Sequence, residues 1–267
     1  MPKTIGLISI KGGVGKTTIA ASLAVELANS FKKKVLLVDA NYGAPNLAIH
    51  LGILTPQKTI HDVLANKVRI KSAIHRSFGL DLIPGSYVYN APLNTLKLKS
   101  KIKKIKKNYD FIIIDSSPSL NEELLSTIIA SDKLFVVTTP DYATTSCSIR
   151  AANIAKQRGR PISGIILNKI RAPKYELTLK EIEKATDIPV VAKIKDDKNA
   201  IRSLFNCVPI SIYNKRSSFS REINNLAAAI TNNKEKHSFL KSLMPSNFRK
   251  EQVNRQVFKE SFYTSQL

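Results

Sequence analysis

A short glycine-rich segment near the N-terminus carries the residues whose types and spacing best indicate chemistry. Residues 11–18 follow an apolar run, residues 3–10, that predicts a buried strand. Glycines allow backbone N–H groups to turn toward one point, and a helix that begins after them adds partial positive charge there. A lysine would reach the phosphates, and a threonine hydroxyl would ligate Mg²⁺. The segment therefore predicts a polyphosphate site made of Lys11, Gly12, Gly13, Val14, Gly15, Lys16, Thr17 and Thr18.

Two aspartates follow apolar runs farther along the chain. Asp39 ends the run Lys-Val-Leu-Leu-Val-Asp, and Asp115 ends Phe-Ile-Ile-Ile-Asp. If both runs are parallel strands, their carboxyl ends lie at the edge of the sheet where ligands bind. Mg²⁺ takes one or two carboxylates together with phosphate oxygens, so Thr17, Asp39 and Asp115 are the predicted metal ligands. A simpler role, capping the turn after each strand, stays open for both aspartates.

The apolar runs alternate with segments of helical periodicity, which sets the fold class. Continuous apolar strands are typical of a parallel sheet covered on both faces, and the alternation implies right-handed βαβ crossovers. We therefore predict an α/β fold, a doubly wound and mostly parallel sheet with helices on both faces. Residues 1–231 form the predicted domain, ending in a helix over about 218–230, and residues 232–267 form a basic, partly amphipathic or disordered tail. The predicted strands cover 3–10, 34–38, 80–83, 111–114, 133–138 and 162–167.

The glycine segment departs from the generic phosphate loop in a specific way. Ile10 stands where the pattern GxxxxGK[ST] has its first glycine, whereas the variant KGGxGKTT is matched in full. This variant resembles the deviant Walker A loop of the ParA/MinD superfamily of ATPases, and the resemblance covers about residues 3–231. It implies ATP and Mg²⁺ as cofactors and an ATP-dependent homodimer. It also implies that Lys11 contacts the phosphates bound by the partner subunit.

Residues around the two aspartates favour one branch of that superfamily. Residues 39–47 resemble the MinD pattern DxDxGxxNLD, and residues 115–118 resemble its DSPAG motif. The resemblance implies a spatial-positioning ATPase of cell division or polar localisation, with a regulatory partner that the sequence does not identify. The rival is a ParA-like partitioning ATPase that binds DNA non-specifically. The net charge of +22 supports this rival, whereas the Pro-Gln pair of plasmid ParA proteins is absent.

Two asparagines occupy positions to which the resemblance gives roles. Asn41 stands where the family usually has a second aspartate that positions the attacking water. An amide bonds water but carries no charge to polarise it, so we predict slow hydrolysis. Asn168, at the end of a predicted strand, matches the family's adenine-contacting asparagine, although a plain turn asparagine is the alternative. Residues 193–197 resemble the loop that flanks the base.

Two basic segments are candidates for binding a surface. Residues 97–107 hold seven lysines and no acid, with apolar residues on one face, and predict a solvated helix that covers the sheet. Residues 236–244 resemble the membrane-targeting helix of MinD. Burial of a few apolar side chains there, with nearby lysines, would favour an anionic membrane, marginally for one subunit and usefully for two. A tail that docks on its own domain or stays disordered is the alternative. The apolar arc consists of Phe239, Leu240, Leu243 and Met244.

The remaining composition excludes several classes. No run approaches the roughly 20 apolar residues of a membrane span, so we expect a cytoplasmic protein, peripheral at the inner membrane face at most. Cys147 and Cys207 form no CxxC pair, which argues against the iron–sulfur carriers of the superfamily. Tyr263 stands alone where the tyrosine-kinase branch has a C-terminal tyrosine cluster.

Overall fold

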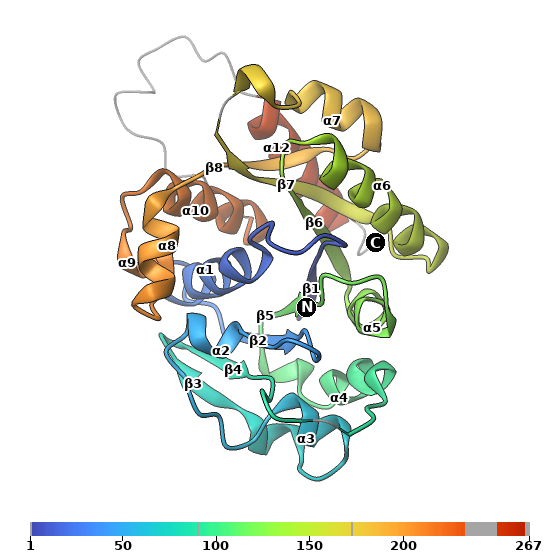
Figure 1. The fold of residues 1–267 in the computed structure, drawn as a ribbon, viewed down its shortest axis with the longest axis vertical. Coiled ribbons are helices and arrows are strands. Elements are labelled where there is room, and N and C mark those ends of the chain that lie inside the picture. The colour runs from blue at the N-terminus through green and yellow to red at the C-terminus, as the bar shows by residue number, and fades with distance from the viewer. Residues whose placement is uncertain (1, 90, 172, 233–249, 265–267) are drawn as a thin grey trace.

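A single mixed sheet runs through the molecule (Figure 1). The structure is a computed structural model, which describes residues 2–89, 91–171, 173–232 and 250–264. In this part of the chain eight strands follow the order β3-β4-β2-β5-β1-β6-β7-β8, and every neighbouring pair is parallel except β3 with β4. The predicted doubly wound α/β fold is confirmed. The strands are β1 Lys3–Ile8, β2 Val35–Ala40, β3 His75–Ser77, β4 Leu80–Ile83, β5 Phe111–Ser116, β6 Lys133–Thr138, β7 Ile162–Ile170 and β8 Val190–Lys195.

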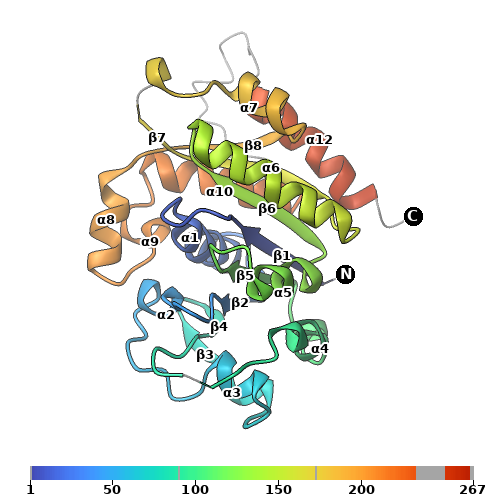
Figure 2. The same cartoon turned by 45° about the vertical axis from the view of Figure 1, so that its right-hand side comes forward.

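Helices cover both faces of this sheet (Figures 1 and 2). One face carries α1 Lys16–Asn29, α2 Leu47–His50, α8 Lys198–Phe205, α9 Ile210–Tyr213, α10 Ser218–Ile230 and α12 Lys250–Thr264. The other face carries α3 Ile60–Leu64, α4 Leu98–Lys103, α5 Glu122–Ala130, α6 Tyr142–Gln157 and α7 Leu179–Thr186. Short 3₁₀ turns at Ile70–Ala73, Thr95–Lys97, Lys106–Asn108 and Pro173–Tyr175 complete the connections.

The continuous apolar strands are explained by this double cover. In β5, Phe111 and Ile113 pack against the α1 and α10 layer, whereas Ile112 and Ile114 face the opposite layer. A strand with helices on both sides has no solvent face, so it contains no alternating polar residues. The lysine-rich helix α4 differs from these strands, because only one of its faces is buried. Leu98, Ile102 and the nearby Ile105 are buried, and most of its lysines are exposed, as predicted for a solvated helix on the sheet.

Strand register brings the two predicted aspartates together. Residue 39 of β2 pairs with residue 115 of β5, and residue 115 also pairs with residue 7 of β1. Both aspartates are buried near the carboxyl ends of central strands, beside the loop that joins β1 to α1. The order of the strands therefore brings Asp115 to Asp39 and the glycine loop, although Asp115 is more than 70 residues from both in the sequence.

The C-terminal helix extends the domain beyond the predicted boundary at residue 231. α12 lies along β8 and α10, at the edge of the sheet (Figure 2). Arg255 is 1% exposed, donates to the Val191 carbonyl at 2.9 Å and forms an ion pair with Glu222 at 2.9 Å. Phe258 is 3% exposed and packs against Phe135 with the ring centroids 5.4 Å apart and the rings tilted by 60°. Residues 250–264 thus cover the edge strand, which would otherwise expose unpaired backbone groups.

The other differences from prediction lie at element ends and in short elements. β1 stops at Ile8, because the glycine loop begins to turn two residues before the apolar run ends. β8 was not predicted as a strand. The apolar arc of the tail, residues 239–244, lies outside the described residues. Within the described ranges, no helix is both long and apolar enough to cross a bilayer.

Candidate nucleotide-binding site

The glycine loop adopts the backbone conformation that a phosphate site requires. Gly13 and Gly15 have φ values of 77° and 89°, in the left-handed region that residues with a Cβ rarely adopt. Gly15 is the N-cap of α1, and a Cβ added there would lie 2.4 Å from Asn168 Nδ2. The loop therefore points toward the start of a 14-residue helix, where free N–H groups and the helix dipole favour an anion.

Lys16 and the two aspartates form a buried charge cluster behind this loop. Lys16 Nζ lies 3.5 Å from Asp115 Oδ1, and the two side chains are 6% and 0% exposed. Burial, reinforced by the neighbouring charge of Asp115, raises the pKa of Asp39 to about 7. Two buried carboxylates beside one ammonium leave a local excess of negative charge, which a bound cation would neutralise.

The carboxylate of Asp115 fits a role as a ligand for Mg²⁺. Among the described residues neither of its oxygens has a hydrogen-bond partner, although both are buried. The nearby Lys16 Nζ, at 3.5 Å, makes no hydrogen bond to it, and a buried carboxylate without hydrogen bonds is costly, so such a group usually meets a ligand, an ion or water. The described residues contain no group of three histidine, cysteine or acidic side chains placed to hold a metal ion. Mg²⁺ needs no such group, because phosphate oxygens and water fill most of its coordination sphere.

Asp39 also organises the loop that follows β2. Its Oδ1 accepts a hydrogen bond from the Asn41 N–H at 3.1 Å, and its Oδ2 accepts from the Leu47 N–H at 3.1 Å. The Asn41 amide donates to the Ala44 carbonyl at 2.6 Å. The side chain at position 41 therefore closes a turn in this structure. Asp39 therefore caps the turn after β2, which was the simpler role left open for it, and it also lies beside Asp115.

Asn168 and Lys169 hold the glycine loop in place through hydrogen bonds to its backbone. Asn168 Nδ2 donates to the Val14 carbonyl at 2.7 Å and is buried, and Lys169 Nζ donates to the Gly13 carbonyl at 2.7 Å. Lys169 has a φ of 55°. The end of β7 thus holds the loop through two side chains. The adenine contact that the resemblance implies for Asn168 stays a prediction, and the contact seen here is with the loop backbone.

Comparison with known proteins agrees with this geometry. The family described as "AAA domain" matches residues 2–158. An uncharacterized ATP-binding protein of Methanocaldococcus jannaschii is 31% identical over 93% of this chain and 97% of its own length. The septum site-determining protein MinD of Thermotoga maritima is 30% identical over 86% of this chain and 88% of its own length. The solved structure of MinD from Pyrococcus horikoshii, complexed with Mg-ADP, matches with a TM-score of 0.82 at 28% identity, over 86% of this chain and 96% of that one.

The chain belongs to the MinD/ParA family of ATPases. In this MinD/ParA ATPase the predicted loop residues lie together around a cavity of about 380 Å³. Lys11, Gly12 and Gly13 are exposed at its mouth, Lys16 is buried in it, and Thr17 and Thr18 are half-buried in its wall. Asn41 lines the cavity too, whereas Asp39, Asp115 and Asn168 lie behind its surface.

Several lining residues were not identified as site residues from the sequence. His50 is buried, and burial lowers its pKa against the opposing effect of Asp115, so it is neutral near pH 7. At the far end, Arg171 Nε donates to Asp196 Oδ2 at 2.6 Å. In the MinD/ParA chain these residues come from α2, the end of β7 and the segment before α8. Asp196 falls within residues 193–197, which resemble the loop that flanks the base, whereas no local motif marks His50 or Arg171, because only the fold brings them to the cavity. The apolar part of that end consists of Ala200, Ile201 and Leu204.

Proposed function

We propose that this ATPase is a MinD-like switch that binds ATP with Mg²⁺, dimerises and localises to a surface, and that it hydrolyses ATP slowly. The observation that carries the proposal is the buried Asp115 carboxylate. It lies beside Lys16 and near a glycine loop that leads, through left-handed backbone at Gly13 and Gly15, into the N-terminus of α1. An anion at the loop and a cation at Asp115 would satisfy both unmet requirements of the site, and Mg²⁺-bound polyphosphate supplies both.

In this proposal the residues of the site have separate roles toward the phosphates, the metal, the base and water. Lys16 and the start of α1 bind and orient the phosphates, and Thr17, Asp39 and Asp115 hold the metal. When bound, Mg²⁺ neutralises charge on the phosphate oxygens. Ala200, Ile201 and Leu204 offer an apolar wall for the base at the far end of the cavity. Asn41 positions water with an uncharged amide, which supports the expectation of slow turnover.

Lys11 has no buried role within one chain, which supports a role between two chains. Its side chain is exposed at the mouth of the cavity, in contrast to Lys16. An exposed lysine at this place can meet phosphates held by a second copy. The test is light scattering after size exclusion, with ATP and Mg²⁺, for the wild type, Lys11→Ala and the control Lys184→Ala. Lys184 is an exposed lysine on α7.

We expect an ATP-dependent dimer for the wild type and for Lys184→Ala, and a monomer for Lys11→Ala. Calorimetry on the same samples separates binding from dimerisation. A Lys11→Ala chain that still dimerises would refute the trans role. A wild-type chain that takes up no ATP at millimolar Mg²⁺ would refute the proposal as a whole.

The surface to which the dimer localises is the second part of the proposal. We propose an anionic membrane, through Phe239, Leu240, Leu243 and Met244. The experiment uses the full chain, because truncation at 231 would uncover β8 and remove the buried Phe258. Co-sedimentation with phosphatidylglycerol vesicles should be lost in Leu243→Glu and kept in the control Leu54→Glu, which changes an exposed leucine of the domain.

A ParA-like DNA-binding ATPase is the second candidate. The exposed lysines of residues 97–107 and the net charge of +22 favour it. DNA co-sedimentation that needs ATP, weakens with salt and survives Leu243→Glu would support this candidate over the membrane. Both candidate functions, MinD-like and ParA-like, include a regulatory protein partner.

A further inference from the structure

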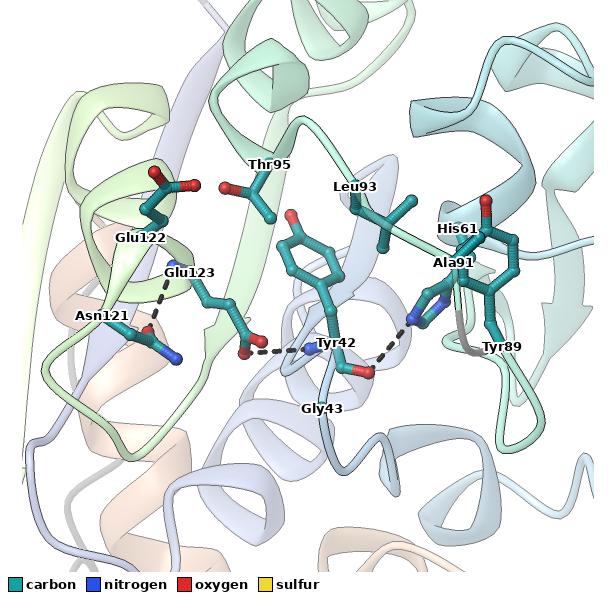
Figure 3. A pocket seen from close by; sticks show the side chains of 10 residues that line it. All are labelled: Tyr42, Gly43, His61, Tyr89, Ala91, Leu93, Thr95, Asn121, Glu122 and Glu123. Atoms are coloured by element: carbon teal, nitrogen blue, oxygen red, sulfur yellow. Dashed lines mark hydrogen bonds between the residues drawn. The ribbon is translucent and has the colours of Figure 1, made fainter.

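A second cavity lies on the other side of the loop that follows β2. It measures about 430 Å³, and its lining consists of Tyr42, Gly43, His61, Tyr89, Ala91, Leu93, Thr95, Asn121, Glu122 and Glu123 (Figure 3). Asn41 lines the nucleotide cavity, and the next residue, Tyr42, lines this one. Neighbouring residues of one loop thus face two separate cavities, and no residue of the glycine loop reaches the second.

Both backbone polar groups of Tyr42 are held by side chains that line this cavity. Its N–H donates to Glu123 Oε2 at 3.2 Å, and its carbonyl lies 3.1 Å from His61 Nε2. The Ser86 N–H donates to His61 Nδ1 at 3.0 Å, so Nδ1 is the acceptor and Nε2 carries the proton donated to Tyr42. Burial lowers the pKa of His61, which keeps the ring neutral in this tautomer. Any group that takes over the Glu123 carboxylate therefore acts on the loop directly.

The lining of the cavity is acidic and aromatic in a strongly basic chain. Glu122 and Glu123 line one side, His61 and Tyr89 line the other, and none of the described lining residues is a lysine or an arginine (Figure 3). The Tyr89 ring already attracts a cation, since Lys67 Nζ lies 5.1 Å from its centroid. The whole chain has a net charge of +22, so this cavity is a local exception whose lining favours a positive group.

A buried hydroxyl in the wall gives an independent sign of a ligand. Thr95 is 7% exposed and lines the cavity, and within the described part of the chain its Oγ1 has no hydrogen-bond partner. In Figure 3 it lies between Glu122 and the Tyr42 ring. A buried hydroxyl without a partner is costly, and a donor entering the cavity would satisfy it.

We propose that this cavity receives an arginine side chain of a protein partner. A planar guanidinium donates in several directions at once, so it can engage Glu122 or Glu123, donate to Thr95 Oγ1 and stack on a tyrosine ring. An ammonium group offers one point charge and no flat face. Leu93 and Ala91 form an apolar wall that suits the aliphatic stem of arginine.

The proposal goes beyond nucleotide binding and requires none, so it is tested without nucleotide. The probe is an N-acetylated, C-amidated Gly-Arg-Gly tripeptide, titrated into the ¹⁵N-labelled full chain and followed by TROSY spectra. The matched probe carries citrulline, which has the shape of arginine without its charge. We expect the arginine peptide to shift the amides of Tyr42, Thr95 and Glu123 saturably at millimolar concentration, and the citrulline peptide to leave them unchanged.

Two variants, each of which removes one negative charge, test where the arginine peptide binds. Glu122→Gln removes an exposed cavity carboxylate, and Asp187→Asn removes an exposed carboxylate at the end of α7, where asparagine tolerates the φ of 54°. Glu122→Gln should weaken the arginine peptide about fivefold, as expected for one partly solvated charged acceptor. Asp187→Asn should leave the affinity unchanged.

Three results would overturn the proposal. Citrulline that binds as well as arginine would show that charge is not recognised. Equal weakening by the two variants would show a general electrostatic effect. A Gly-Lys-Gly peptide of equal affinity would remove the case for a guanidinium. Each of these results leaves ATP binding untouched, so the two proposals fail separately.

Discussion

Replacing Asn41 with aspartate separates the catalytic role of this position from its structural one. The Asn41 amide donates to the Ala44 carbonyl at 2.6 Å, and the side chain is 8% exposed. Asn41→Asp exchanges this donor for an acceptor, so two oxygens face each other across the turn. This hydrogen bond is partly buried, since Asn41 is buried and Ala44 is exposed, and losing it beside a new acceptor costs about 1–3 kcal/mol. The new carboxylate also lies near Asp39, whose pKa of about 7 already reflects burial and the charge of Asp115.

We therefore expect Asn41→Asp to lower the free energy of unfolding of the nucleotide-free protein by about 1–3 kcal/mol, measured by urea denaturation. With ATP and Mg²⁺ the same change supplies a charged group to orient water, and kcat should rise at least about tenfold. Asn41→Ala is the matched control. It loses the same hydrogen bond without adding charge, so it should lose stability and gain no turnover.

The refuting result is specific. If Asn41→Asp is folded, binds ATP as tightly as the wild type and turns over at the same rate, then position 41 does not reach the attacking water. In that case the amide serves the turn alone, and slow hydrolysis needs another cause. If Asn41→Ala gains turnover equally, loop mobility controls the rate instead of charge.

Three further predictions concern the loop, the C-terminal helix and pH. Gly15→Ala should abolish ATP binding in calorimetry, because its Cβ would lie 2.4 Å from Asn168 Nδ2; Gly159→Ala, with a φ of 66° and open space, is the control that should bind normally. Phe258→Ala should cost about 3–5 kcal/mol in urea denaturation and speed proteolysis of α12, and cleavage without loss of stability would refute its packing. Burial and, to a smaller extent, the positive charge of Lys133 lower the pKa of Lys3 to about 8. The unfolded chain thus binds more protons above that pH, and the stability of the wild type relative to Lys3→Met should rise between pH 8 and about 10.5, with no rise contradicting the assignment.

The parts of the fold that were predictable from sequence are those with a local cause. The glycine loop is visible because left-handed backbone needs glycine at Gly13 and Gly15. The central strands are visible because double cover removes polar residues from most of their length, as in residues 111–114 of β5. The meeting of Asp39 with Asp115 followed from a general property of parallel sheets. Each of these inferences needs only a short stretch of chain and one rule.

The parts that were missed depend on pairs that are distant in the sequence. Arg255 looked like one more solvated cation of a basic tail, but its charge is matched by Glu222 and its N–H by the carbonyl of Val191. The base contact expected of Asn168 stays a prediction, but the sequence did not reveal the hydrogen bond from its amide to the Val14 carbonyl, 154 residues earlier. Composition reports neither pairing, because a polar side chain looks the same in sequence whether water or a buried carbonyl receives it.

The loop after β2 connects these findings, because its successive residues face different cavities. Asp39 fixes the backbone at Asn41 and Leu47, while Glu123 and His61 fix it at Tyr42. Of the side-chain contacts that hold the loop, two thus come from its own aspartate and two come from α5 and α3. A metal ion that takes up Asp39 would weaken the first pair, and an arginine that takes up Glu123 would weaken the second. Since both pairs hold the same short backbone segment, we expect occupancy of one cavity to change the free energy of binding in the other, and linkage would make such an effect reciprocal.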